Sequence, residues 1–310
     1  MHAITDRATG QRHPRLLRPA IIVACVLIGL AIGLAARADT PPGRRPGAPL
    51  VEPMTVSAAD RAATRARVGE IARGLRIPGR AGSPRRTFHA LDLGIVDETD
   101  VADHRGRIVA VIRTDGATGA LRSVVRLDWT TDADDPRVDR SGAAAHARRH
   151  ARLAGLVAPA GHPSVRWDDA MDAWRVDWVR RIDGLAVTGD GLTVWVHRGG
   201  QLAAMTRSET ASSAPPLERI APAAAAAAAR AWADRHGVPT KDLSVVVDTE
   251  LTWVRPNDFL TRGGAQDTDL LLHLAYRVDL AIPMTGSSRH RIAIFVDAGS
   301  GALLAGVETA

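Results

Sequence analysis

The sequence contains a single cysteine, Cys25, which lies inside an apolar run near the N-terminus. The remainder of the chain therefore has no disulfide framework, no thiolate metal site and no cysteine nucleophile. Lysine is almost absent as well, because Lys241 is the only lysine among 40 basic residues. Together with the abundance of alanine, this bias indicates high-GC coding, so the number of arginines says little about chemistry.

The formal net charge of +6 comes mostly from the N-terminus, where residues 1–38 hold five arginines and one aspartate. A face that binds a polyanion needs a clustered surplus of cations. No such cluster follows in the sequence, which also lacks a glycine-rich phosphate loop. We therefore expect no nucleic-acid partner.

The first 38 residues have the pattern of an export or anchoring signal. Residues 1–18 form a basic, cytoplasmic n-region, and 19–38 a signal peptide or membrane anchor. Residues 19–36 carry no charge, and as a helix they would span about 27 Å, close to the thickness of a bilayer core. We predict an extracytoplasmic protein that is either membrane-anchored by 19–36 or secreted after cleavage near Ala38.

A proline-rich tether, 39–55, leads into three modules, 56–130, 131–213 and 214–310, and each reads as a helix followed by strands. Helices are predicted at 57–75, at 142–156 and from Pro222 through the alanine run 223–229. Strands are predicted at 88–95, 107–113, 121–128, 164–168, 173–182, 185–197, 201–207, 243–254, 269–281, 290–297 and 302–308. The predicted fold class is α+β, built of repeated modules of one helix packed on an antiparallel sheet.

Two internal echoes support repetition. The segment 173–177, Ala-Trp-Arg-Val-Asp, returns at 275–279 as Ala-Tyr-Arg-Val-Asp. The segment 115–121, Asp-Gly-Ala-Thr-Gly-Ala-Leu, returns at 297–303 as Asp-Ala-Gly-Ser-Gly-Ala-Leu. The second pair predicts a hairpin in which Asp and Thr or Ser cap the turn and glycine takes the positive-φ position.

Residues 182–196 and three later segments, 251–254, 274–278 and 295–303, resemble the propeptide region of thermolysin- and fungalysin-type metallopeptidases, including its PepSY-type module. The resemblance covers roughly 140–308. It implies a stand-alone, propeptide-like protein that inhibits a secreted metallopeptidase or helps it to fold. The His-Glu-x-x-His zinc motif of the peptidase domain is missing, so we expect no enzymatic activity and no cofactor.

His146 and His150 are the only metal candidates with a helical ligand spacing, because i and i+4 lie on one helix face. The position of the general-base glutamate holds Ala147, and Arg148 and Arg149 would repel a dication. Ordinary surface histidines are the favoured interpretation. A metal-dependent hydrolase that uses this pair is the third functional alternative.

Other polar and aromatic groups invite a site but have plainer explanations. Two aspartate clusters lack the pattern of a calcium loop and are typical of turns: Asp132, Asp134 and Asp135, and Asp168, Asp169 and Asp172. Four tryptophans are expected to pack in the core, and two Arg-Val-Asp segments to form exposed ion pairs: Trp167, Trp174, Trp178 and Trp195, and 175–177 and 277–279. Three serines lie outside any nucleophile elbow: Ser141, Ser164 and Ser208.

The sequence thus predicts a non-enzymatic extracytoplasmic binding protein without catalytic, cofactor or metal residues. Its expected partner is a secreted metallopeptidase or another envelope protein, contacted by an exposed sheet edge or the 305–310 tail through strand addition. The alternative is a structural or sensory module of the cell envelope, anchored by its N-terminal helix and without a peptidase partner.

Overall fold

The computed structural model describes residues 51–89, 94–128, 137–236, 245–256, 271–283 and 289–309. Contacts divide the chain into residues 1–47 and 48–310. The predicted n-region, anchor or signal helix and the start of the tether lie outside the described residues. Among the helices of the described ranges, none is both long and apolar enough to cross a bilayer.

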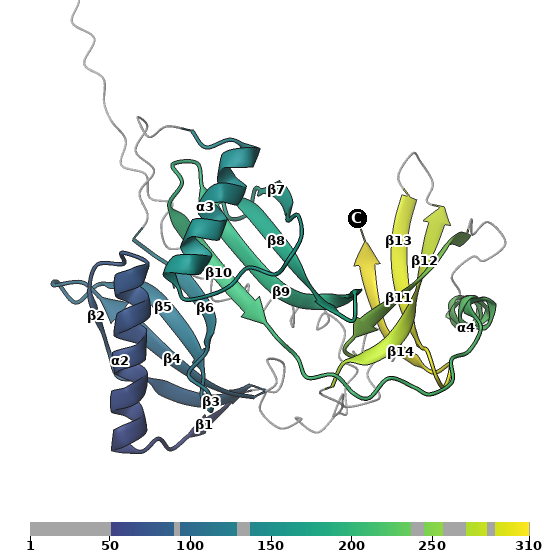
Figure 1. The fold of residues 1–310 in the computed structure, drawn as a ribbon, viewed down its shortest axis with the longest axis horizontal. Coiled ribbons are helices and arrows are strands. Elements are labelled where there is room, and N and C mark those ends of the chain that lie inside the picture. The colour runs from purple at the N-terminus through teal and green to yellow at the C-terminus, as the bar shows by residue number, and fades with distance from the viewer. Residues whose placement is uncertain are drawn as a thin grey trace, which may run out of the picture. The chain divides into compact units, whose positions relative to one another are not determined.

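Three helices and fourteen strands are described (Figure 1). The helices are α2 (Ala58–Gly74), α3 (Arg140–Leu153) and α4 (Pro222–Arg235). The strands are β1 (Val51–Met54), β2 (Arg80–Ala81), β3 (Arg85–His89), β4 (Gly94–Ala102), β5 (Ile108–Asp115), β6 (Leu121–Arg126), β7 (Ser164–Asp168), β8 (Ala173–Ile182), β9 (Leu185–His197), β10 (Leu202–Ser208), β11 (Val245–Val254), β12 (His273–Pro283), β13 (Arg289–Asp297) and β14 (Leu303–Thr309).

The predicted fold class, repeated modules that each hold one helix on its own antiparallel sheet, is wrong. The strands form one 14-stranded sheet. β6 and β10 pair antiparallel, which joins the first two predicted modules. β9 and β11 pair in parallel at Val187 and Trp253, so the sheet is mixed. The physical reason is that a separate sheet would leave unpaired backbone groups at each of these edges, and pairing satisfies them.

The first two predicted modules also share one hydrophobic core. Helices α2 and α3 cover the same face of the sheet, and side chains of both belong to a single buried cluster (Figure 1). A row of cross-strand partners runs through this core from β7 to β4, and all of its members are buried: Val165, Val176, Val194, Met205, Val124, Ile112 and Thr99.

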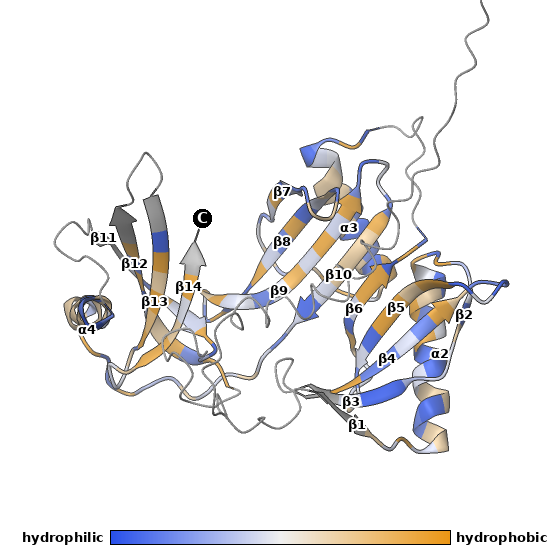
Figure 2. Ribbon diagram, turned by 180° about the vertical axis from the view of Figure 1, so that it is seen from behind, coloured by the Kyte–Doolittle hydropathy of each residue, from blue (hydrophilic) through white to orange (hydrophobic). Residues whose placement is uncertain are grey.

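The opposite face of the same strands is polar. The next row of partners contains Ser164, Asp177, Thr193, Thr206, Ser123, Arg113, Glu98 and Arg85. Hydrophilic and hydrophobic residues accordingly alternate along these strands (Figure 2). This alternation identifies a sheet with one buried and one solvated face.

The helices begin where the sequence supplies a cap. Ser57 accepts a hydrogen bond from the Asp60 amide at the start of α2, and Asp139 accepts one from the Gly142 amide at the start of α3. Pro222 opens α4, and buried alanines of this helix lie with Trp232 against the apolar face of β11–β13 in a second core.

Candidate functional site

His146 and His150 lie on one face of α3, as their spacing predicts, with ring centroids 6.4 Å apart. Both contact Gly200 in the β9–β10 turn. The His150 Nε2 lies 2.9 Å from the Gly200 carbonyl oxygen, and the His146 ring fills the space that a Cβ of residue 200 would need. The two histidines are half-buried and hold α3 on the turn.

The hydrogen bond to Gly200 fixes the tautomer of the neutral His150 ring. A carbonyl oxygen can only accept, so Nε2 carries the proton and Nδ1 is the free acceptor. The Nδ1 atom is buried and has no hydrogen-bond partner among the described residues. Burial lowers the pKa of His150; the hydrogen bond to the Gly200 carbonyl opposes this shift, and the positive charges near the ring, including Arg149 and Arg126, add to it.

Tryptophans and aspartates of β7–β9 surround the same end of the sheet. Trp178 and Trp195 are buried, and the Trp195 indole donates to the Asp168 carboxylate at 2.9 Å. Trp174 donates to the Val138 carbonyl at 2.9 Å and meets Trp167 edge to face, with centroids 5.3 Å apart. Trp178 and Trp195 are packed in cores, as predicted, whereas Trp167 and Trp174 are only half-buried.

The remaining candidate residues do not converge. Asp168 accepts the amides of Ala170 and Met171 in a turn, whereas Asp132, Asp134 and Asp135 lie outside the described residues. Within the described ranges no three acidic, histidine or cysteine side chains are grouped as metal ligands.

The serines and the Arg-Val-Asp segments are also scattered. Ser141 donates to the capping Asp139, and Ser208 donates to Asp190. Arg175–Asp177 and Arg277–Asp279 are ion pairs within single strands. None of these groups assembles a nucleophile with a base.

Sequence reasoning missed a buried polar cluster at Asp190 in β9. Its carboxylate accepts hydrogen bonds from the Ser208 hydroxyl (2.6 Å), the Thr210 amide (2.6 Å) and the Thr210 hydroxyl (3.0 Å). Arg180 pairs with the same carboxylate at 3.0 Å and donates to the Thr210 carbonyl at 2.6 Å. In the sequence, the flanking glycines 189 and 191 indicate only turns.

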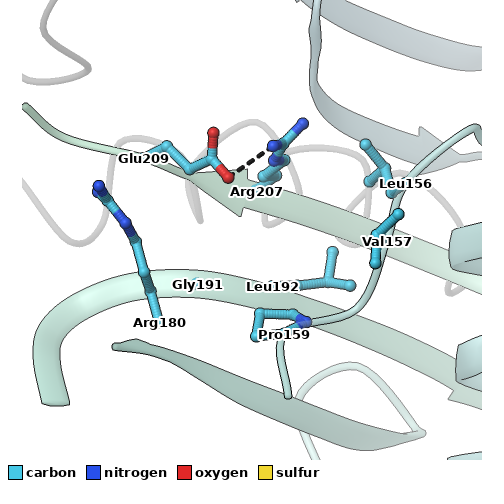
Figure 3. Close-up of a pocket in the computed structure, with 8 residues that line it drawn as sticks. All are labelled: Leu156, Val157, Pro159, Arg180, Gly191, Leu192, Arg207 and Glu209. Atoms are coloured by element: carbon cyan, nitrogen blue, oxygen red, sulfur yellow. Dashed lines mark hydrogen bonds and ion pairs between the residues drawn. The ribbon is translucent and has the colours of Figure 1, made fainter. Parts of the chain in front are cut away.

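A small open cavity lies beside this cluster (Figure 3). Its volume of about 30 Å³ is close to that of one water molecule. Charged side chains gather on one side, where Arg207 and Glu209 form an ion pair, and apolar side chains on the other. The lining residues are Leu156, Val157, Pro159, Arg180, Gly191, Leu192, Arg207 and Glu209.

Among the described strands, β14 is the last of the sheet and pairs only with β13, although Gly306 within it has a further interaction. The register shifts between Phe295 and Val296, which leaves Leu304 as an extra residue in a β-bulge. The Val307 side chain is 39% exposed on this strand.

Comparison with known proteins finds a distant structural likeness but no matching family model. The structure is similar to that of the Bacillus megaterium YpeB C-terminal domain, with a TM-score of 0.43 and 11% sequence identity, over 82% of this chain and 98% of that one. No family model matches the sequence, and no curated protein matches it either. At this TM-score the likeness identifies neither a family nor a function, and the resemblance to metallopeptidase propeptides stays a prediction.

Proposed function

We propose that this chain is a non-enzymatic, extracytoplasmic protein that binds another protein by strand addition at the edge of β14. The observation that carries the proposal is the contrast between β14 and the other ends of the sheet. An edge strand presents backbone N–H and C=O groups to any extended segment, and proteins protect such edges when they are not used.

The other edges carry protective features. β1 contains Pro53, which cannot donate a ladder hydrogen bond, and also Glu52. β7 has only five residues, and two of them, Arg166 and Asp168, are charged. β14 has seven residues without proline, and Glu308 is its only charge. Its composition therefore favours pairing with a further strand, along residues 305–309, since the bulge at Leu304 interrupts the edge before them.

The positions of the candidate catalytic groups support a binding role. The histidine pair is engaged with the β9–β10 turn, and Ser141 and Ser208 donate to carboxylates of their own surroundings. A general base or nucleophile must reach a substrate proton or carbon in an accessible pocket. The cavity beside Asp190 has room for a single small group.

The nature of the partner rests on the sequence. The resemblance of 182–196 and 295–303 to metallopeptidase propeptides points to a secreted metallopeptidase that the chain inhibits or helps to fold. The uncharged run 19–36 favours export, which would bring the chain and such an enzyme into one compartment.

A titration of peptidase activity tests the proposal. Secreted metallopeptidases from the same cells are assayed with increasing amounts of the full chain, of Val307→Lys and of Ile108→Lys. We expect saturable inhibition by the native chain that is about tenfold weaker for Val307→Lys, since a charge at an edge opposes strand addition.

Ile108→Lys is the matched control, because Ile108 is 47% exposed but lies in β5, between two paired strands. It should inhibit like the native chain. Unchanged peptidase activity at every concentration contradicts the proposal. If the uncleaved chain is then also found in the membrane fraction, the alternative of a structural or sensory envelope module is favoured.

A further inference from the structure

The cavity beside Asp190 combines two arginines with an apolar rim. Arg180 and Arg207 line it together, opposite Leu156, Val157 and Pro159 (Figure 3). Val157 is 93% exposed, which is unusual for a valine beside a pocket. A single exposed valine is ordinary by itself, and it acquires meaning here only because two arginines line the same cavity.

Asp190 and Thr210 hold the guanidinium of Arg180 in place through its Nη1 atom. Its Nη1 atom donates to the Asp190 carboxylate and to the Thr210 carbonyl, and Asp190 is itself fixed by three further hydrogen bonds. Within the described part of the chain, Nε and Nη2 of Arg180 make no hydrogen bond. A pre-organised guanidinium loses little entropy when it binds an anion.

Arg207 is held less firmly. Its Nη2 atom pairs with Glu209 at 2.5 Å, and the two side chains are 32% and 51% exposed. Exposed pairs of this kind contribute little to stability, so an incoming carboxylate can replace Glu209 at small cost. Glu209 thus occupies a position that a ligand would take.

We propose that this cavity binds one carboxylate carried beside an aliphatic side chain on an extended peptide. The arginines supply charge-assisted donors for the carboxylate, and the exposed Val157 with the half-buried Pro159 contacts the neighbouring aliphatic group. The cavity is small, about 30 Å³, and open to solvent, so that a planar anionic group can enter while the rest of the peptide lies outside it. The carboxylate comes either from a peptide C-terminus or from an aspartate side chain. The site is separate from the edge of β14.

Fluorescence anisotropy with labelled hexapeptides tests this proposal on the full chain. One peptide ends in leucine with a free carboxylate, the second is its C-terminal amide, and the third is an amide with an internal aspartate beside valine. If the first peptide binds saturably and at least about tenfold more tightly than the second, its amide, the carboxylate comes from a peptide C-terminus. If the third peptide binds at least about tenfold more tightly than the second, the carboxylate comes from an aspartate side chain.

Variants connect the binding to the cavity. Arg207→Ala should weaken the preferred peptide about tenfold, whereas Arg166→Ala, an exposed arginine on β7, should leave its affinity unchanged. Glu209→Gln should strengthen binding several-fold, because it frees Arg207. Val307→Lys should bind the peptide like the native chain, which separates this site from strand addition at β14.

Equal affinity for all three peptides, or native affinity in Arg207→Ala, overturns the proposal. The same conclusion follows if no peptide binds saturably at about 1 mM. Thermal unfolding of each variant shows that it is folded. Arg180→Lys, which retains a cation beside Asp190 but loses the planar fork, should also weaken binding and provides a second test.

Discussion

At the scale of single residues, Gly200 shows how α3 is held on the sheet. Its backbone has φ of +83°, which a side chain adopts only with strain. A Cβ at this position would lie 2.5 Å from the His146 Cε1 atom. The glycine is therefore required twice, once by the turn and once by the histidine ring.

Gly200→Ala should lower the free energy of unfolding by about 2–4 kcal/mol, through left-handed strain and overpacking together. Chemical denaturation measures the change. Gly184→Ala is the matched control, because Gly184 has φ of +80° but open space, out to 4 Å, where alanine would place its Cβ. It should cost only about 1–2 kcal/mol. Equal costs at the two positions would contradict a specific contact with His146.

The buried histidines also make stability depend on pH. Burial lowers the pKa of both His150 and His197 below the ordinary 6.5, although the Asp172 carbonyl and carboxylate partly oppose this at His197. The unfolded chain then binds more protons than the folded chain as the pH falls below about 6.5, so stability decreases in that range. Equilibrium unfolding at a series of pH values measures this.

His150→Gln retains an amide donor for the Gly200 carbonyl but cannot be protonated, so its stability should vary less between pH 7 and pH 5. His104→Gln is the control, because His104 is exposed. A native pH profile in His150→Gln would show that this ring does not contribute.

The spacing of His146 and His150 correctly predicted a shared helix face. Their contact lies fifty residues further along the chain, in a turn, and no local pattern in the sequence indicates it. The same holds for Asp190, whose hydrogen-bond partners are brought to it by the return of β10. The chemical character of these side chains follows from the sequence, but their hydrogen-bond partners depend on the tertiary fold.

At the scale of elements, the hairpin turns were predicted down to their hydrogen bonds. Asp115 accepts the Thr118 amide and hydroxyl, and Asp297 accepts those of Ser300 in the same way. Gly119 and Gly301 take the positive-φ position, at +68° and +75°. Local side-chain chemistry determines these turns, so the sequence alone was sufficient.

Asp115→Ala should therefore lower the free energy of unfolding by about 1–3 kcal/mol at neutral pH. Burial opposes the shift, but the Arg122 guanidinium and the Thr118 donors lower the pKa of Asp115 to about 2. The carboxylate's contribution is thus present above the ordinary value of 3.8 and is lost as the pH falls toward 2. Asp169→Ala, at an exposed turn residue without a side-chain hydrogen bond in the described structure, should change stability little; a similar loss there would contradict the turn argument.

β4 was missed, because three of its central residues, Asp97, Glu98 and Asp100, have poor strand propensity. Asp97 is buried and pairs with Arg86 at 2.7 Å, while Glu98 pairs with Arg85 and Arg113 on the opposite face. Cross-strand charge pairs stabilise this strand, and they become visible only once its register is known.

At the scale of the whole chain, local repeats predicted separate modules, and the structure joins them instead. The strands themselves were mostly recognised, and β7, β8 and β9 have the predicted bounds. Strand edges are joined by backbone hydrogen bonds, and the backbone groups that form them are common to nearly all residue types. Sequence patterns therefore did not reveal the pairing of β6 with β10 or of β9 with β11.

Because α2 and α3 share one core, a cavity in that core should reduce the protection of both helices against amide hydrogen exchange. Met205 in β10 is fully buried in the cluster that contains residues of both α2 and α3. Met205→Ala should cost about 2–5 kcal/mol and raise amide hydrogen exchange in both helices. Leu280→Ala, a buried substitution in the second core, should leave both helices protected. Faster exchange in α3 alone would contradict a shared core.

The central functional claim is that a partner protein adds a strand at the edge of β14. The most direct test is amide hydrogen exchange of the chain with and without a secreted metallopeptidase from the same cells. We expect the enzyme to slow amide hydrogen exchange across Leu303–Thr309, and we expect Val307→Lys to abolish this protection. Unchanged exchange in β14, with protection confined to other strands, would contradict it.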